Sequence, residues 1–305
     1  MYPVPTEATT QGRTDQYIAS WLAKDKSRRS KVILATKVAG TSERITWLRD
    51  SGKGTRVNRA NIMESVDKSL KRLGVEHIDL LQIHWPDRYV PLFGAASYDY
   101  AQEREAEPIA AQLAALGELV KAGKVRHIGV SNETSFGVMT WCAAAAAAGL
   151  PKIASIQNSY SLLQRGAFET DLAEVCSPRN CNVGLLAYSP LAGGSLTGKY
   201  VGPVAPAGAR FSLFQGYMER YNKSLAREAV AAYVALAAKH GMSPAALALR
   251  FCASRPFVTS TIIGATTMAQ LKENIDAFDG PPLSAEALAD IAATFKRYRD
   301  PATDA

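Results

Sequence analysis

The chain has 305 residues, of which 47% are hydrophobic and 21% charged, which is typical of a globular protein and excludes a disordered or fibrous one. No apolar run is long enough to span a membrane, and residues 1–10 lack the basic start and apolar core of a signal peptide. The net charge of +7 comes from scattered lysines and arginines, without the basic stripe and interleaved aromatics of a nucleic-acid groove. We therefore expect neither a nucleic-acid nor a membrane partner.

The four cysteines predict a reducing compartment, because they form no C-x-x-C pair and show no metal-ligand spacing. They are Cys142, Cys176, Cys181 and Cys252. We expect reduced thiols, no metal site and a cytoplasmic location. The sequence leaves open whether an organelle-targeting peptide lies upstream of Met1.

The first third of the chain alternates helical and strand patterns. Apolar residues at helical spacing predict a helix over 14–26, and we interpret the basic cluster within 26–31 as a solvated face. A buried strand over 32–36 ends at Lys37, and a polar, solvent-exposed loop covers 40–57. Asn58 is expected to cap a helix that runs to Leu73 and ends at Gly74. The apolar run 78–83 predicts a strand buried on both faces, which stops at His84 because Pro86 cannot continue a hydrogen-bonded ladder.

The same unit repeats to the end of the chain. Strands are predicted at 125–130, 153–156, 183–187 and 257–263. Helices are predicted at about 108–122, over a segment that includes 143–148, and at 166–177, 223–240, 243–254, 268–275 and 284–298. A loop rich in glycine and proline spans roughly 192–222. No change of composition marks a second domain, so we expect one domain over residues 1–305.

Alternating strands and helices predict a parallel α/β fold with six strands. A doubly wound open sheet can hold six, whereas a closed (β/α)8 barrel needs eight. No G-x-G-x-x-G follows the first strand, which disfavours the dinucleotide fold that uses it. The pattern alone leaves this choice open.

Polar side chains follow nearly every predicted strand. The residues are Lys37, His84, Ser131, Asn132, Gln157, Tyr188 and Ser189. A single histidine at a strand end is more often simply hydrogen-bonded or solvated than catalytic. A set of polar residues at corresponding positions of successive units predicts one shared site, because chemistry in α/β barrels takes place at the carboxyl ends of the strands.

Seven stretches of this sequence resemble the aldo-keto reductases. They are MYPVP, ATKVAG, IHWPDR, IGVSNET, IQNSYSLL, LLAYSPLAGGSLTGKY and IIGATTMAQLKEN, and the resemblance runs from residue 1 to about 298. It is nearest to the bacterial Tas-like group and more distant to the potassium-channel β-subunit branch. The resemblance implies a (β/α)8 barrel that binds NADPH without a Rossmann motif and reduces a small-molecule carbonyl, an aldehyde or ketone, to an alcohol.

The resemblance places the family's catalytic tyrosine on Tyr2, its lysine on Lys37 and its histidine on His84. A carbonyl that accepts hydride needs a proton on its oxygen, and a tyrosine hydroxyl has a pKa of about 10. The ammonium of Lys37 would lower that pKa, and His84 would hydrogen-bond the carbonyl oxygen and orient it.

The resemblance also implies a set of cofactor-binding residues. Ser131, Asn132 and Gln157 would hold the carboxamide of the nicotinamide, and Tyr188 would stack on its ring. The remaining expected contacts are Ser189, Leu191 and Gly193 at the pyrophosphate, Lys199 and Arg210 at the phosphates, and Gln270, Glu273 and Asn274 at the adenosine.

The sequence departs from the family pattern at its start. The family's catalytic aspartate precedes the tyrosine by five positions, and its first two strands and first helix would also lie upstream of Met1. We therefore expect six of the eight strands, an N-terminally incomplete fragment, and reduced stability or turnover. The competing interpretation is a non-catalytic aldo-keto reductase fragment that binds only a cofactor or a partner. The substrate and the oligomeric state are not readable from the sequence.

Overall fold

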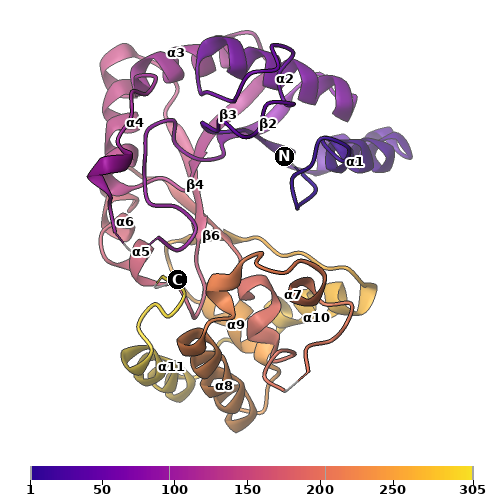
Figure 1. Cartoon of the computed structure of the whole chain (residues 1–305), viewed down its shortest axis with the longest axis vertical. Helices are drawn as coiled ribbons and strands as arrows, with labels where there is room; N and C mark the ends of the chain where they lie inside the picture. The colour runs from indigo at the N-terminus through magenta and orange to yellow at the C-terminus, as the bar shows by residue number, and fades with distance from the viewer. Residues whose placement is uncertain (1, 96, 203, 304–305) are drawn as a thin grey trace. The chain divides into compact units, whose positions relative to one another are not determined.

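The computed structural model describes residues 2–95, 97–202 and 204–303. Met1 lies outside them. The fold is α/β with a six-stranded parallel sheet in the order β1-β2-β3-β4-β5-β6 (Figure 1). The strands are β1 (Ala35–Val38), β2 (Ile78–Ile83), β3 (Val125–Ser131), β4 (Ile153–Ser159), β5 (Gly184–Tyr188) and β6 (Val258–Thr261). All six predicted strands are present, consistent with part of a (β/α)8 barrel.

The chain divides into two compact units, which are described separately. The first comprises Met1–Val90 and Tyr100–Ile156, and the second Pro91–Asp99 and Gln157–Ala305. The prediction that residues 1–305 form one domain stays a prediction.

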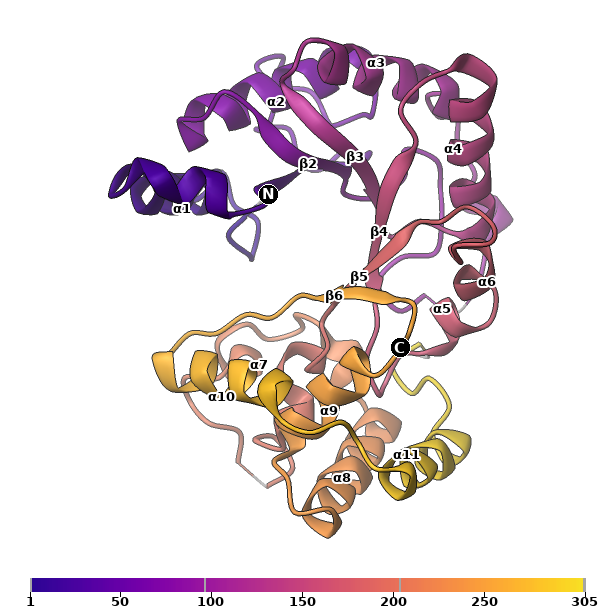
Figure 2. The same cartoon turned by 180° about the vertical axis from the view of Figure 1, so that it is seen from behind.

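The first unit holds β1, β2, β3 and most of β4. Its helices are α1 (Arg13–Ala23), η1 (Lys26–Lys31), α2 (Arg59–Leu73), η2 (Tyr100–Gln102), α3 (Ile109–Lys121) and α4 (Ser135–Ala148). Helix α2 packs against β1 and α3 against β3. Figure 2 shows α3 on the outer side of β3. Every residue of β2 is buried, which is the reason that its sequence is a nearly continuous apolar run.

The second unit holds β5, β6 and the remaining helices. These are α5 (Gly166–Glu169), α6 (Leu172–Val175), η3 (Ala192–Thr197), α7 (Arg210–Leu213), η4 (Glu219–Tyr221), α8 (Ser224–Lys239), α9 (Pro244–Ala253), α10 (Met268–Asp279) and α11 (Ala285–Arg297). Ala246, Leu249 and Ala277 form a buried cluster that joins α9 to α10. The predicted helix over 166–177 is two short helices, and the predicted loop over 192–222 contains three short helical turns.

Helix α2 begins and ends where the sequence predicts. The side chain of Asn58 accepts a hydrogen bond from the backbone N–H of Asn61 at 3.0 Å, which satisfies one of the donors at the helix start. Gly74 adopts the left-handed conformation at the other end, with φ of 65°, and glycine reaches that region without a steric cost.

Two predictions about the first unit are wrong in part. The first strand covers Ala35–Val38 instead of 32–36, because Leu34 turns its backbone N–H to the carboxylate of Asp79 before the strand begins. The loop 40–57 is exposed at its tip, but its base is buried, with Thr55 and Val57 both 0% exposed. Short polar segments can be buried when their backbone groups find partners, and the base of this loop is hydrogen-bonded across Ser42 and Thr55.

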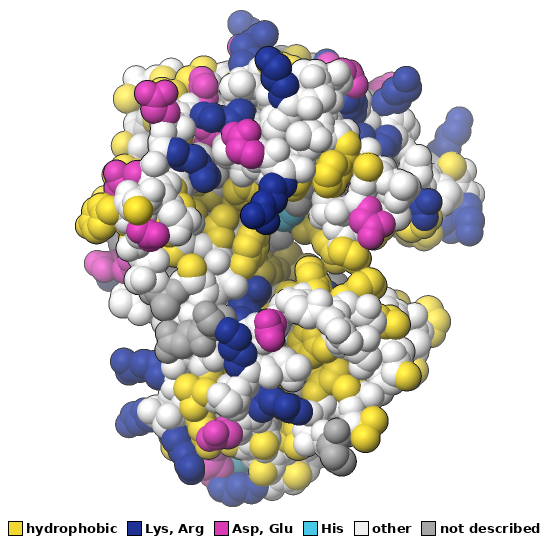
Figure 3. All heavy atoms as spheres, in the orientation of Figure 1, with side chains coloured by type: hydrophobic (Ala, Val, Ile, Leu, Met, Phe, Trp, Pro, Cys, Tyr) yellow, Lys and Arg dark blue, Asp and Glu magenta, His cyan; other side chains and the backbone are white. Residues whose placement is uncertain are grey.

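The basic cluster within 26–31 is only partly a solvated face. Arg29 lies against the buried carboxylate of Asp79, with Nη2 and Oδ2 2.7 Å apart, and it also donates to the carbonyl of His77. On the face shown in Figure 3, basic side chains are otherwise dispersed among acidic ones. Within the described ranges, no helix combines the length and apolar character that crossing a membrane requires.

Candidate active site

The side chains of Tyr2, Lys37 and His84 meet in the first unit. Lys37 lies within β1 and His84 directly follows β2. The two strands are parallel, with Lys37 opposite Gln82 and Val38 opposite Ile83, so both residues lie at the carboxyl ends of their strands. The segment before α1 brings Tyr2 to the same place.

The distances put the three groups within one interacting cluster. The hydroxyl of Tyr2 lies 3.4 Å from Nε2 of His84, and the two rings stack with centroids 5.6 Å apart. Nζ of Lys37 is 5.3 Å from the centroid of the Tyr2 ring. Tyr2 is 39% exposed, so solvent reaches this part of the cluster.

Burial controls the charge of this cluster. Desolvation lowers the pKa of Lys37 to about 8, because the charged ammonium loses hydration when it is buried. The pKa of His84 is held well below its usual range, first by burial and then by the positive charge of Lys37. His84 is therefore neutral at physiological pH, and a neutral imidazole can donate one hydrogen bond without carrying charge.

The backbone of His84 is fixed by both neighbouring strands. Its N–H donates to the carbonyl of Val38 at 2.8 Å, and its own carbonyl accepts a hydrogen bond from Nδ2 of Asn132 at 2.8 Å. Asn132 also donates to Oγ of Ser131 at 3.2 Å. Two of the three residues expected to hold the carboxamide thus lie together, Ser131 as the last residue of β3 and Asn132 directly after it, where Asn132 also supports the histidine.

The expected phosphate-binding residues lie in the second unit. Tyr188 ends β5, and Ser189, Leu191 and Gly193 follow it into η3. Gly193 has φ of 67°, so the backbone turns there in a conformation that favours glycine. Gln157 lies in the last part of β4 and is mostly buried.

Lys199 and Arg210 form a pair of neighbouring cations. The charge of Arg210 and partial burial both lower the pKa of Lys199, and burial is the larger cause. A Cβ at Gly194 would come within 2.9 Å of Cε of Lys199. Two cations beside a glycine-rich turn fit a phosphate group, because an anion would relieve their mutual repulsion.

The three residues expected at the adenosine each have a partner within the protein. Oε1 of Gln270 accepts from the backbone N–H of Thr266 at 2.9 Å, and Oε1 of Glu273 accepts from Oγ of Ser243 at 3.0 Å. Nδ2 of Asn274 donates to the carbonyl of Gly264 at 3.4 Å. Asn274 is buried, so it holds the turn before α10.

Sequence reasoning missed the residues that support the site. Arg88 binds the buried carboxylate of Glu133 through two hydrogen bonds of 3.0 and 2.6 Å, which joins the segment after β2 to the segment after β3. Asp87 is 1% exposed. The available signal was the Asp-Arg pair that begins three residues after His84, close to a buried strand, where charged residues need partners.

Comparison with known proteins agrees with this arrangement. The sequence profile of the aldo/keto reductase family matches residues 2–295. The chain is 47% identical over 306 residues to Protein tas of Escherichia coli (strain K12), covering 99% of this chain and 85% of that protein. It is 44% identical over 255 residues to an aldo-keto reductase of Babesia bovis, covering 81% and 89%.

A more distant relative is a probable voltage-gated potassium channel subunit beta of Arabidopsis thaliana. It is 29% identical over 280 residues, which cover 91% of this chain and 77% of that protein. The family profile spans nearly the whole sequence and includes both strand ends that carry Lys37 and His84. The chain therefore belongs to the aldo/keto reductase family.

Proposed function

We propose that this protein is an NADPH-dependent reductase that converts an aldehyde or ketone to an alcohol, with Tyr2 as proton donor. Family membership supports an oxidoreductase. The observation that carries the finer proposal is the cluster of Tyr2, Lys37 and His84, in which the tyrosine hydroxyl lies 3.4 Å from the histidine ring.

Each residue of the cluster has a distinct part in this proposal. The neutral ring of His84 donates a hydrogen bond to the carbonyl oxygen and fixes its orientation. The charge of Lys37, 5.3 Å from the Tyr2 ring, stabilises the phenolate and so makes the hydroxyl of Tyr2 a stronger acid. Tyr2 then gives its proton to the oxygen as negative charge develops there.

NADPH, when bound, supplies the hydride. In the first unit, Ser131 and Asn132 are proposed to hold its carboxamide. In the second unit, the remaining proposed contacts are Gln157, Tyr188, Ser189, Leu191, Gly193, Lys199, Arg210, Gln270, Glu273 and Asn274. The preference for NADPH over NADH rests on Lys199 and Arg210, because the 2′-phosphate adds charge that two neighbouring cations favour.

The test is a Tyr2→Phe substitution, which removes the hydroxyl and keeps the ring. We expect NADPH oxidation with a panel of aldehydes and ketones to fall at least about a hundredfold, as loss of a general acid does, with NADPH binding unchanged by fluorescence titration. Tyr17→Phe is the matched control, since Tyr17 is exposed on α1. Equal turnover in Tyr2→Phe and the parent protein would refute the role given to Tyr2.

A further inference from the structure

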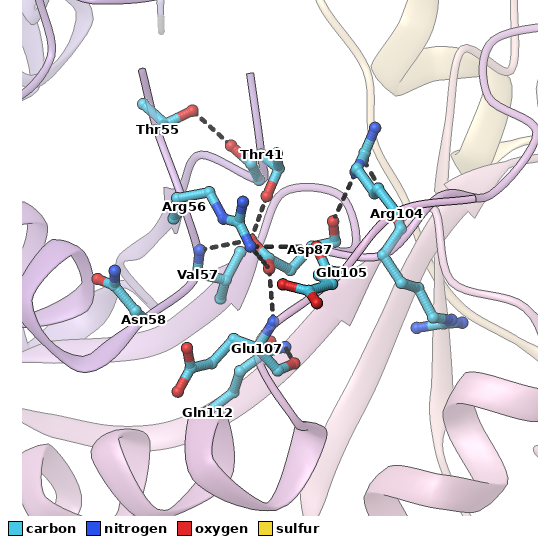
Figure 4. Close-up of polar contacts among 12 residues, drawn as sticks. Thr41, Thr55, Arg56, Val57, Asn58, Asp87, Arg104, Glu105, Glu107 and Gln112 are labelled. Carbon is cyan, nitrogen blue, oxygen red and sulfur yellow. Dashed lines mark hydrogen bonds and ion pairs between the residues drawn. The ribbon is translucent and has the colours of Figure 1, made fainter. Parts of the chain in front are cut away.

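Asp87 is a buried carboxylate three residues after His84, and the proposed reaction gives it no part. Its side chain is 0% exposed. A carboxylate taken out of water is costly unless donors surround it, so its hydrogen bonds indicate what it holds in place. Figure 4 shows these contacts.

The carboxylate joins two chain segments to the end of β2. Oδ1 accepts from the hydroxyl of Thr41 and, at 2.8 Å, from the backbone N–H of Val57. Oδ2 accepts from the backbone N–H of Glu107 at 2.8 Å and lies 3.3 Å from Nη2 of Arg56. Thr41, Arg56 and Val57 belong to the loop that follows β1, and Glu107 precedes α3 (Figure 4).

Thr41 connects Asp87 to the surroundings of His84 through Trp85. Its hydroxyl binds Asp87, and its carbonyl accepts a hydrogen bond from Nε1 of Trp85 at 2.9 Å. The Trp85 ring lies 4.9 Å from that of His84, centroid to centroid. The Trp85 ring also fills the space beside Gly40, where a Cβ would come within 2.2 Å of Cδ1.

We propose that Asp87 is a positioning residue that sets the orientation of the His84 ring through Thr41 and Trp85. The inference rests on the proposed function for its effect on turnover, but its effect on the ring does not depend on that function. A change of Asp87 to Asn replaces one acceptor oxygen by an NH2 group that faces two donors. Thr41 and Trp85 are then no longer held in place, so the Trp85 ring no longer fixes the orientation of the His84 ring.

The matched control is Asp79→Asn. Asp79 is also buried and lies near the start of β2, whereas Asp87 follows the end of that strand. Asp79 accepts a hydrogen bond from the backbone N–H of Leu34 at 2.8 Å and pairs with two guanidinium groups. Its neighbouring histidine is His77, with Nε2 3.5 Å from Oδ1. The two variants therefore remove comparable networks, but only one network leads to His84.

The experiment records the imidazole NMR signals of the four histidines, assigned with a His84→Gln variant, together with carbonyl reduction. We expect Asp87→Asn to shift the His84 signal and to lower kcat about tenfold or more, as small displacements of catalytic groups do, with the Kd for NADPH unchanged. Asp79→Asn is expected to shift the His77 signal and to leave the His84 signal and kcat unchanged.

Several outcomes would overturn the inference. One is an unchanged His84 signal in folded Asp87→Asn, and another is an equal response of His84 to Asp79→Asn. If Asp87→Asn does not fold, Thr41→Val decides, because it removes the same contact from the other side with little change in volume. If the parent protein has no turnover, the proposed function fails while the NMR comparison still supports or refutes the role of Asp87.

Discussion

Lys37 carries a charge that the folded chain accommodates poorly. Its ammonium is largely desolvated and its pKa falls to about 8. Among residues 2–95, 97–202 and 204–303, no carboxylate forms an ion pair with it. The residue that the proposed chemistry needs is thus one that opposes folding, a combination that is common at functional sites.

The pKa of Lys37 makes both turnover and stability depend on pH. Above about 8 the folded protein loses the Lys37 proton, so we expect carbonyl reduction to decline as pH rises through this value. The unfolded chain keeps this proton to about pH 10.4. It therefore binds more protons between these values, and the contribution of Lys37 to the free energy of unfolding rises with pH there.

It follows that Lys37→Met should stabilise the chain at pH 7 by about 1–2 kcal/mol, less than the full pKa shift would give because solvent still reaches part of the side chain. Urea denaturation at pH 7 and at pH 10 measures the gain, which should shrink at the higher pH. The control is Lys121→Met on the exposed side of α3. A loss of stability in Lys37→Met at pH 7 would contradict this account.

At the scale of single elements, the caps of α2 offer the cleanest test. Asn58→Ala removes the hydrogen bond to the backbone N–H of Asn61 and should lower the free energy of unfolding by about 1 kcal/mol. Lys71→Ala on the exposed face of the same helix should change it by a few tenths at most. Chemical denaturation of both variants makes the comparison, and equal stabilities would show that the cap contributes nothing.

Elements with strong local chemistry were predictable, and those decided by distant contacts were not. Neighbouring residues in the sequence determine three of these features: the cap at Asn58, the helix end at Gly74 and the buried apolar run of β2. The start of β1 was misplaced because it depends on Asp79, 45 residues beyond Leu34, which takes the N–H that a strand would use. The buried base of loop 40–57 was missed because its partner carboxylate, Asp87, lies after the next strand.

At the scale of the whole molecule, the alternation of six strands with helices predicted a parallel α/β fold. It did not decide between an open sheet and part of a closed barrel. The resemblance narrowed that choice and predicted which residues meet, and the structure places Tyr2, Lys37 and His84 together. Spacing could not reveal the supporting network of Asp87, because a buried carboxylate and an exposed one look the same in a sequence.

The net charge of +7 predicts a salt dependence for cofactor binding. An anionic cofactor is attracted by the overall field and by Lys199 and Arg210, and salt screens both. We expect the Kd for NADPH to rise roughly three- to tenfold between 50 and 500 mM salt. Arg210→Ala should bind more weakly and with a shallower salt dependence, whereas Arg227→Ala, exposed on α8, should follow the parent protein.

The hydrogen bonds of His84 have a consequence for the entropy of substrate binding. Its N–H is bonded to β1, its carbonyl to Asn132 after β3, and its ring lies against Tyr2 and Trp85. Ordering a backbone residue costs about 1–2 kcal/mol, and here that cost arises when the chain folds. A bound carbonyl therefore meets a hydrogen-bond donor whose conformational freedom is already lost, so orienting the substrate requires no further ordering of the protein at this residue.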